Sequence, residues 1–304
     1  MQLVTIAVLL TCYNRREKTL QCLQALCQQS LPIGIELKPY LVDDASTDGT
    51  AEAVKQEYPN VHLIQGTGSL FWNGGMRYAF EAAQVEDPDY YLWLNDDTAL
   101  YPHALKTLLD VSAKLSSQGQ GKAIVVGSTL DPETGSPSYG GVMQTYWWHP
   151  LKFHHVHPAP DQPSLCDTLH GNCVLVPRAV AALIGNFNPE YTHNLGDYDY
   201  GLRARRKGCS VCMAPGYLGT CSANPPSSRM VKTELTQANW NQVDRPKGLA
   251  MEDVTLHSFH EWKAFCREHG GAFWFFYWLL PYRRLLWLML NRLSPPDQCP
   301  QTDR

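Results

Sequence analysis

The sequence has little excess charge and only one closely spaced pair of cysteines. Its net charge is −4 over 304 residues with a pI near 6.2, which gives no reason to expect nucleic acid as a partner. Among ten cysteines only Cys209 and Cys212 form a C-x-x-C, without a second pair at zinc-site spacing. These two should lie on opposite faces of a strand. The irregular spacing favours small core residues in a reducing compartment, so we expect a cytoplasmic protein.

Two familiar nucleotide-binding motifs are absent. The loop 66–75 contains several glycines but matches neither G-x-x-x-x-G-K-[ST] nor the dinucleotide fingerprint. We therefore expect no P-loop, and glycines such as Gly74 instead predict tight turns and a close approach of the backbone to a ligand. The sequence also lacks a recognisable Ser-His-Asp or Cys-His arrangement, which agrees with chemistry that needs no covalent nucleophile.

Hydrophobic runs long enough to cross a bilayer are missing as well. The opening apolar run has no basic segment before it and no small-residue cleavage site, so it predicts a buried strand rather than a signal peptide. Near the other end, Pro281 and two arginines divide the apolar segment 271–290. This segment fits either an interfacial membrane helix pair or a buried interface, and we favour contact with a membrane surface.

Strands and helices alternate over the first hundred residues, which predicts an α/β fold. We expect a Rossmann-like, doubly wound and mostly parallel sheet flanked by helices. The apolar patterns predict strands near 3–10, 36–42, 61–64 and 90–94, helices near 20–27 and 51–58, and a helix that follows the loop 66–77 and ends near 83.

The second half of the expected sheet is less regular. A helix near 103–115 and a strand at 123–128 precede the histidine-rich segment 136–163, for which a mobile surface loop is favoured over a metal site. The remaining elements are expected at 166–176, 177–184, 194–208 and 210–214. We thus predict a catalytic domain at 1–215, with halves 1–100 and 101–215, then a flexible loop at 216–246 and a helical extension at 247–304.

The stretch Tyr90–Pro102 combines a buried strand with an acidic turn. The apolar run ends in Asn95, Asp96 and Asp97, at the place where open α/β sheets bind ligands. Two neighbouring carboxylates repel each other unless a cation or hydrogen-bond donors compensate them, and hard oxygen ligands suit Mn²⁺ or Mg²⁺. We therefore predict a metal and diphosphate site. The alternative is a polar turn that caps the following helix.

A second polar centre opens the helix near 194–208. Acids lie in its first turn, bases in its last and a glycine follows, as the helix dipole and the C-cap favour. Asp199 and Arg203 are four residues apart and can pair, which leaves Asp197 as the better candidate for a free carboxylate. His257 or His260 can supply another metal ligand, although ordinary helix histidines are the simpler interpretation.

Together these motifs resemble family 2 glycosyltransferases of the GT-A fold, the group that includes bacterial rhamnosyltransferase-like enzymes. The resemblance covers residues 3 to about 215 and rests on motifs whose order and spacing match: Thr11-x-Tyr13-Asn14-Arg15, Asp43-Asp44-x-Ser46-x-Asp48-Gly49-Thr50, Leu94-Asn95-Asp96-Asp97 and Gly196-Asp197-x-Asp199.

The resemblance implies roles for particular residues. Asp197 is the implied catalytic base, with Asp199 as the alternative because Gly196 replaces a glutamate that many relatives have. Asn95-Asp96-Asp97 is the implied form of the DXD motif of these enzymes, with Asp97 as the ligand of Mn²⁺ or Mg²⁺. Asn95 departs from the acid that this motif usually has at its first position. The remaining implied contacts are with the nucleotide sugar: Thr11, Tyr13, Arg15, Asp43, Asp44, Trp72, Gly74, Arg77, Asn95, Asp96, Gly171 and Asn172.

The implied reaction is an inverting sugar transfer in cell-surface polysaccharide or glycan synthesis. A carboxylate deprotonates the acceptor hydroxyl, and a metal stabilises the leaving diphosphate. The donor would be a nucleoside-diphosphate sugar, and the acceptor a saccharide or a lipid-linked glycan. Aromatic faces such as Trp72, Trp147 and Trp148 can stack on sugars, although core packing is the default for tryptophan. The alternatives are a sugar-phosphate nucleotidyltransferase and a non-catalytic carbohydrate-binding protein on the same fold.

Overall fold

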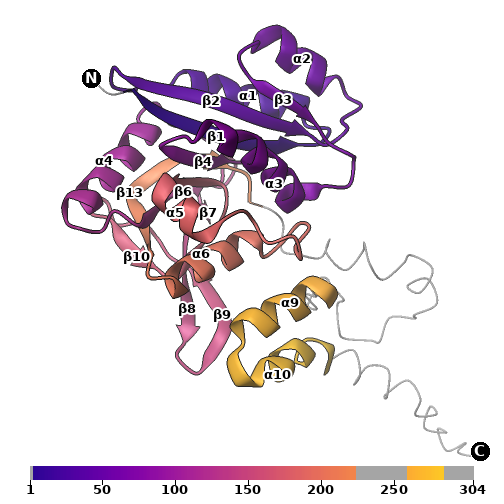
Figure 1. Cartoon of the computed structure of the whole chain (residues 1–304), viewed down its shortest axis with the longest axis vertical. Helices are drawn as coiled ribbons and strands as arrows, with labels where there is room; N and C mark the ends of the chain where they lie inside the picture. The colour runs from indigo at the N-terminus through magenta and orange to yellow at the C-terminus, as the bar shows by residue number, and fades with distance from the viewer. Residues whose placement is uncertain (1–2, 224–258, 284–304) are drawn as a thin grey trace, which may run out of the picture. The chain divides into compact units, whose positions relative to one another are not determined.

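A computed structural model of the chain describes residues 3–223 and 259–283. The chain divides into two units, residues 1–223 and 224–304, which are taken separately. Within residues 3–223 the main feature is a ten-stranded sheet with helices on both faces, and a second sheet of three strands accompanies it (Figure 1).

The elements of the first unit follow the alternation expected from the apolar pattern. Its strands are β1 (Val4–Cys12), β2 (Ile35–Asp43), β3 (His62–Gln65), β4 (Tyr90–Leu94), β5 (Thr98–Leu100), β6 (Ala123–Leu130), β7 (Pro137–Tyr139), β8 (Gly141–Tyr146), β9 (His149–His155), β10 (Ser164–Cys166), β11 (Thr168–Leu169), β12 (Cys173–Pro177) and β13 (Ser210–Cys221). Its helices are α1 (Arg16–Cys27), α2 (Thr50–Glu57), α3 (Phe71–Ala83), η1 (Gln84–Glu86), α4 (Ala104–Ser117), α5 (Arg178–Ile184) and α6 (Gly196–Arg206).

The large sheet is mixed, which differs from the mostly parallel sheet expected. Its main path runs β10-β13-β6-β12-β4-β1-β2-β3. The pairs of β1 with β2, β1 with β4 and β2 with β3 are parallel, as predicted. Strand β12 lies between β4 and β6 and is antiparallel to both. The parallel part is therefore confined to β1–β4 and to the pair of β6 with β13.

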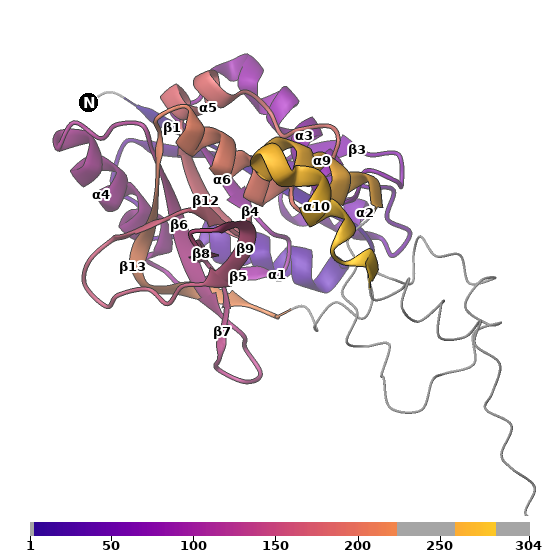
Figure 2. The same cartoon turned by 90° about the horizontal axis from the view of Figure 1, so that it is seen from below.

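Alternating side chains of the central strands form two apolar layers. One layer packs against α3, α5 and α6, and the other against α1, α2 and α4. Figure 2 shows α3, α5 and α6 on one side of the strands and α1 on the other. Cys209 belongs to the first layer and Cys212 to the second, so the expectation that they face opposite ways is confirmed. The nine cysteines in the described residues are all free thiols.

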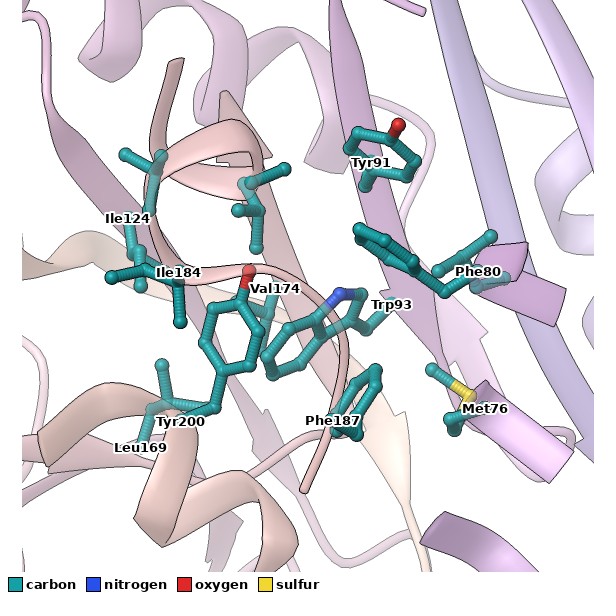
Figure 3. Packing of buried hydrophobic residues seen from close by; sticks show 14 of the residues in the cluster. Met76, Phe80, Tyr91, Trp93, Ile124, Leu169, Val174, Ile184, Phe187 and Tyr200 are labelled. Atoms are coloured by element: carbon teal, nitrogen blue, oxygen red, sulfur yellow. The ribbon is translucent and has the colours of Figure 1, made fainter. Parts of the chain in front are cut away.

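Trp93 on β4 is the centre of the first layer. It is fully buried, and its ring lies 4.5 Å from that of Phe187 and 4.8 Å from that of Tyr200. Figure 3 shows these rings together with Met76 and Phe80 from α3. This packing joins α3 and α6 to the strand that precedes the acidic turn, and so fixes the distance between the two polar centres.

Two segments are more regular than the sequence indicated. The interpretation of 136–163 as a mobile loop is wrong, because β8 pairs with β9 on one side and with β11 on the other in the three-stranded sheet. The final strand was expected to end at 214, yet β13 continues to Cys221. Pro215 and Gly216 are turn-forming residues, and here they form a bulge within the strand. The rest of the expected loop 216–246 lies outside the described residues beyond 223.

The second unit is described over residues 259–283. It contains α9 (Phe259–His269), η3 (Gly271–Phe273) and α10 (Trp274–Leu279). The indole Nε1 of Trp262 donates a hydrogen bond to the carbonyl oxygen of Tyr277 at 3.2 Å, and Phe259 packs edge-on against Trp278. None of the helices in the described ranges is both long and apolar enough to cross a bilayer.

Gly75 lies where α3 packs most closely on β1, and this contact predicts a loss of stability on substitution. A Cβ at Gly75 would overlap the Thr11 side chain, so Gly75→Ala should lower the free energy of unfolding by about 1–3 kcal/mol despite its better helix propensity. Urea denaturation measures this. Gly121→Ala, whose Cβ would lie at an ordinary 3.4 Å from Ser116 Oγ, should change it by less than about 0.5 kcal/mol. Equal stability of the two variants would contradict the close packing.

Candidate active site

The carboxyl ends of β1, β2 and β4 meet at one edge of the sheet and carry polar loops. Cys12 lies opposite Asp43 and Trp93 lies opposite Leu9, so the acidic residues that follow β4 come beside the ends of β1 and β2. Such an edge is where open α/β sheets bind ligands. The site therefore consists of loops held by the strands rather than of a surface on one helix.

The two aspartates that end β2 have different surroundings. The Asp44 carboxylate accepts hydrogen bonds from the backbone N–H groups of Gly68, Leu70 and Phe71 at 2.7–3.1 Å, so it fixes the loop before α3. Asp43 is fully buried, and its Oδ1 accepts the Ser46 N–H at 3.0 Å. Its Oδ2 has no hydrogen-bond partner among the described residues. Asp43 is thus the one with an acceptor left for a ligand.

Backbone strain is concentrated around this edge. Five non-glycine residues have positive φ in the described ranges, and four of them, Asn14, Ala45, Phe71 and Leu195, lie in the loops of the two polar centres. Such conformations cost on the order of 1–3 kcal/mol each and persist where neighbouring contacts determine them. One such contact joins two loops, since Asn14 Oδ1 accepts the Thr47 N–H at 2.7 Å.

Arg15 lies between the two carboxylates of the acidic turn. Its Nη1 is 3.2 Å from Asp96 Oδ1 and 3.1 Å from Asp97 Oδ2. Asp96 is 5% exposed, and burial raises its pKa to about 7, with Arg15 acting in the opposite direction. The guanidinium is half-exposed and therefore supplies the compensating charge that the two acids require.

Asn95 is occupied by a neighbouring tryptophan. Its Oδ1 accepts a hydrogen bond from Trp72 Nε1 at 2.7 Å, and its backbone N–H donates to the carbonyl oxygen of Asn172 at 3.2 Å. The position that is acidic in the implied motif thus serves here to connect α3 with the acidic turn. Asn95 is consequently not directed toward a cation.

Asp97 offers the more accessible carboxylate of the turn. Its Oδ1 accepts a hydrogen bond from the Cys221 thiol at 3.3 Å, and Cys221 in turn receives one from Asn172 Nδ2 at 3.3 Å. The described residues contain no group of three or more His, Cys, Asp or Glu side chains able to enclose a metal. A single carboxylate fits Mg²⁺ or Mn²⁺, because these ions complete their shells with water and substrate phosphates.

Asp197 lies in the first turn of α6, and the residue as a whole is partly exposed. Its Oδ2 accepts the Gly171 N–H at 3.0 Å and its Oδ1 accepts the Tyr198 N–H at 2.8 Å. Burial raises the pKa of Asp197 to about 6, while the two N–H donors and the charge of His193 lower it. A carboxyl with a pKa near 6 can accept a proton at neutral pH.

Asp199, the alternative base, has a different position. It is fully buried, and its Oδ2 is 2.7 Å from Arg203 Nε, as the four-residue spacing predicted. Arg203 also donates to the carbonyl oxygens of Ile184 and Asn186. The pair therefore joins α6 to the end of α5, and the Asp199 carboxylate is turned away from solvent.

The turn at Gly171 and Asn172 connects the two polar centres. Gly171 donates to Asp197, while Asn172 contacts Asn95 through its carbonyl oxygen and Cys221 through its amide. A Cβ at Gly171 would overlap the Trp72 ring, so only glycine lets the turn lie against this indole. The acidic turn, Trp72 and Asp197 thus form one continuous site.

Thr11, Gly74, Tyr13 and Arg77, the other predicted site residues, have different surroundings. Thr11 packs under α3 against Gly75, and Gly74 lies against Leu70 in the first turn of that helix. Tyr13 is 55% exposed beside the site loops. Arg77 pairs with Glu81 on α3 at 3.7 Å, and its carbonyl oxygen accepts a hydrogen bond from Asn186. The structure therefore joins Arg77 to the 186 segment rather than to the acidic turn.

Further candidates belong to other elements. Trp147 and Trp148 occupy the tip of the β8–β9 hairpin, where Trp147 is 93% exposed. His260 is exposed on α9, in the second unit, and His257 lies outside the described residues.

Three residues at the site were not given a role from the sequence. Cys221 follows a bulge beyond the expected end of its strand, and no local pattern relates it to Asp97. His170 and Tyr198 flank Gly171 and Asp197, and they are hydrogen-bonded to each other at 3.2 Å. Their adjacency to predicted site residues was the only available signal, because the contact joins segments 28 residues apart.

Comparison with curated proteins finds a bacterial transferase. Over 188 residues the chain is 26% identical to the N-acetylglucosaminyl-diphospho-decaprenol L-rhamnosyltransferase of Mycobacterium tuberculosis, in strains CDC 1551 / Oshkosh and ATCC 25618 / H37Rv. The match covers 55% of this chain and 61% of the relative, so it spans less than two thirds of that protein's length.

Comparison with solved structures supports the fold. Crystal structures of S. aureus TarS residues 1–349, alone and in complex with UDP, align with TM-scores of 0.50 and 0.51 at 17% and 15% identity. They cover 72% and 73% of this chain, and 60% and 62% of the TarS chain. At such identities the likeness shows the fold alone, and the expected fold class is confirmed.

The family comparison covers most of the site. A family model described as glycosyl transferase family 2 matches residues 7–179, more than half of the chain. The matched range contains Asp43, the acidic turn and the turn at Gly171, and the motifs of the sequence predicted the same family. This result leaves no support for a sugar-phosphate nucleotidyltransferase. The chain belongs to glycosyl transferase family 2.

Proposed function

We propose that the protein is an inverting glycosyltransferase that moves a sugar from a nucleoside-diphosphate sugar to a hydroxyl acceptor, in cell-surface polysaccharide or glycan synthesis. The observation that carries this proposal is the joining of two kinds of carboxylate through one turn. Asp197 has a pKa raised to about 6, and Gly171–Asn172 connects it to the acidic turn. One centre suits proton transfer and the other suits binding of a charged diphosphate.

Asp197 acts as the general base in this proposal. It accepts the proton of the acceptor hydroxyl while the hydroxyl oxygen bonds to the anomeric carbon of the donor. The bond from that carbon to the diphosphate oxygen breaks, and its electrons leave with the diphosphate. Asp199 is less suited, because its carboxylate is fully buried and paired with Arg203.

Asp97 is the proposed ligand of Mn²⁺ or Mg²⁺. Asp96 is buried and Asn95 accepts from Trp72, so Asp97 has the carboxylate best placed for a cation. When bound, the cation supplies positive charge that stabilises the leaving diphosphate. Arg15 adds a half-exposed positive charge beside the same turn.

The nucleotide of the donor is proposed to bind where β1 and β2 end. The buried Asp43 Oδ2 is an acceptor for an N–H or a hydroxyl of the nucleoside, and the exposed ring of Tyr13 can stack on a base. Asp44 contributes by fixing the loop before α3. The UDP complex of TarS supports a nucleoside diphosphate as the class of ligand.

For the acceptor we propose a saccharide or lipid-linked glycan at a membrane surface. The name of the mycobacterial relative includes a decaprenol diphosphate, which supports a lipid-linked acceptor. Three aromatic side chains on η3 and α10 of the second unit are 44–65% exposed: Phe273, Phe275 and Phe276. Together with Leu279 they suit peripheral contact at the cytoplasmic face of a membrane.

Replacing Asp197 tests the proposed base. Asp197→Asn keeps the size of the side chain but cannot accept the proton, so kcat should fall by about 10²–10⁴-fold while nucleotide binding is retained. Initial-rate assays with calorimetry measure both. The exposed Asp110→Asn serves as a control and should leave kcat unchanged. In contrast, Asp199→Asn should lower the melting temperature, because it breaks a buried ion pair.

The pH dependence of kcat is a second test of Asp197 as the base. The base is active when ionised, so kcat of the unmodified protein should fall as pH drops through about 6 and reach a plateau above it. If Asp197→Asn retains this profile and most of the rate, another residue is the base.

Replacing Asp97 tests the metal and diphosphate site. Isothermal calorimetry with UDP, dTDP and GDP, each with and without Mn²⁺, should identify one nucleotide that binds, and Mn²⁺ should strengthen binding. Asp97→Ala should weaken the Mn²⁺-supported binding by about tenfold or more, since it removes a charged ligand. Asp110→Ala is the matched control. Absence of nucleotide binding under every condition would favour the non-catalytic carbohydrate-binding alternative.

The exposed face of α10 predicts vesicle binding. Replacing Phe275 and Phe276 with serine should weaken binding to vesicles of anionic phospholipid by about tenfold per side chain, because each aromatic ring would leave an apolar environment. Cosedimentation measures this binding. Val85→Ser removes a similarly exposed apolar residue of the first unit and should have no effect. Undiminished binding of the double variant would refute membrane contact through α10.

A further inference from the structure

Both oxygens of the Asp197 carboxylate are bonded to backbone donors from different segments. Gly171 N–H, in the turn before β12, donates to Oδ2 at 3.0 Å, and Tyr198 N–H, in α6, donates to Oδ1 at 2.8 Å. The carboxylate is therefore held between two elements that are distant in sequence. The position of the carboxylate therefore depends on the contacts between the turn before β12 and α6.

A side-chain hydrogen bond joins the same two elements directly beside the carboxylate. Tyr198 Oη lies 3.2 Å from Nε2 of His170, the residue before Gly171. His170 Nδ1 faces Gly140, whose carbonyl oxygen lies at 3.2 Å and whose N–H lies at 3.4 Å. With the ring proton on Nδ1, Nε2 accepts from the tyrosine hydroxyl. The other tautomer reverses the donor but keeps the bond.

Packing around this bond limits its movement. The Tyr198 ring is edge-on to Phe153 of β9 at 5.4 Å, and the His170 ring is edge-on to Tyr139 and to His155 at about the same distance. Burial lowers the pKa of His170 to about 4 and raises that of Tyr198. The imidazole is consequently neutral and the phenol protonated near neutral pH, which are the states that this bond requires.

We propose that His170 and Tyr198 are positioning residues that keep the two backbone donors on the Asp197 carboxylate. Without their hydrogen bond, the turn at Gly171 and the start of α6 would separate more readily. The carboxylate would then lose part of its stabilisation in the charged form and part of its fixed orientation. The proposal deepens the proposed function, since it rests on Asp197 as the base.

Other groups around Asp197 bear on its titration. His193, on the segment before α6, is the charged group that lowers the pKa of Asp197. Trp72 from α3 lies against Gly171 and Asn73 lies against Gly196, and neither side chain titrates. The turn before β12 contributes the neutral His170. A pKa change on loss of the Tyr198 hydroxyl is thus separable from a change in nearby charge.

Carbon-13 NMR of the full chain labelled at aspartate tests the proposal without a substrate. The Asp197 carboxyl resonance is assigned by its absence from Asp197→Asn, and it should titrate near pH 6. Tyr198→Phe removes one oxygen and should raise this midpoint by about half to one pH unit. His170→Gln retains an acceptor for the tyrosine hydroxyl, so its midpoint should equal that of the unmodified protein. Tyr58→Phe, which loses a hydroxyl bond to the Leu20 carbonyl, should change nothing.

The outcomes separate this proposal from the proposed function. An unchanged Asp197 midpoint in Tyr198→Phe would overturn the positioning role, as would a midpoint that shifts equally in Tyr58→Phe. If Tyr198→Phe does not fold, His170→Leu removes the same bond from the other side, and the same shift is expected. If Asp197 is the base and the pair positions it, kcat of Tyr198→Phe should fall about tenfold at unchanged KM for the donor. A shifted midpoint with unchanged kcat would support the pair and contradict Asp197 as the base.

Discussion

Compensation of negative charge is the constraint on which the site depends. The parallel strands β1, β2 and β4 bring several carboxylates to one edge, where each raises the pKa of its neighbours unless a donor or a cation compensates it. Asp44 receives three backbone N–H groups, and Asp96 and Asp97 share Arg15. The strained loop conformations direct these donors. Asp43 Oδ2 and Asp96 Oδ2 are the buried carboxylate oxygens of this edge that have no hydrogen-bond partner among the described residues.

The same constraint explains why one short turn carries so many contacts. The Asn172 carbonyl oxygen accepts from Asn95, and the Asn172 side-chain amide donates to Cys221. The Gly171 N–H donates to Asp197. A turn without large side chains can approach three elements at once, and the Trp72 ring fills the space that a Cβ would need. The distance between the acidic turn and Asp197 is consequently set by backbone geometry and by packing on Trp93, rather than by flexible side chains.

The strands and helices of the first hundred residues could be predicted because their signals are local. Apolar periodicity, polar turns and capping residues are read within one element, and the parallel order of β1–β4 follows from their alternation with helices. The motifs likewise led to Asp43, Asp97 and Asp197 as candidates, and their roles stay predictions. The antiparallel β12, the β8–β9 hairpin and the extension of β13 depend on pairing between distant segments, which one-dimensional patterns do not contain. Cys221 and the bond of His170 with Tyr198 were missed for this reason.

The departure at Asn95 is consistent with the charge constraint. Trp72 Nε1 requires an acceptor in the acidic turn, and either an amide or a carboxylate oxygen can provide it. A carboxylate there would add a third negative charge to a turn in which a single guanidinium already contacts two. Asparagine supplies the acceptor without that charge, so the bond to Trp72 leaves the electrostatic balance of Asp96, Asp97 and Arg15 unchanged. The loss of an acid at this position is therefore compatible with the proposed site, in which Asp97 alone would face the diphosphate.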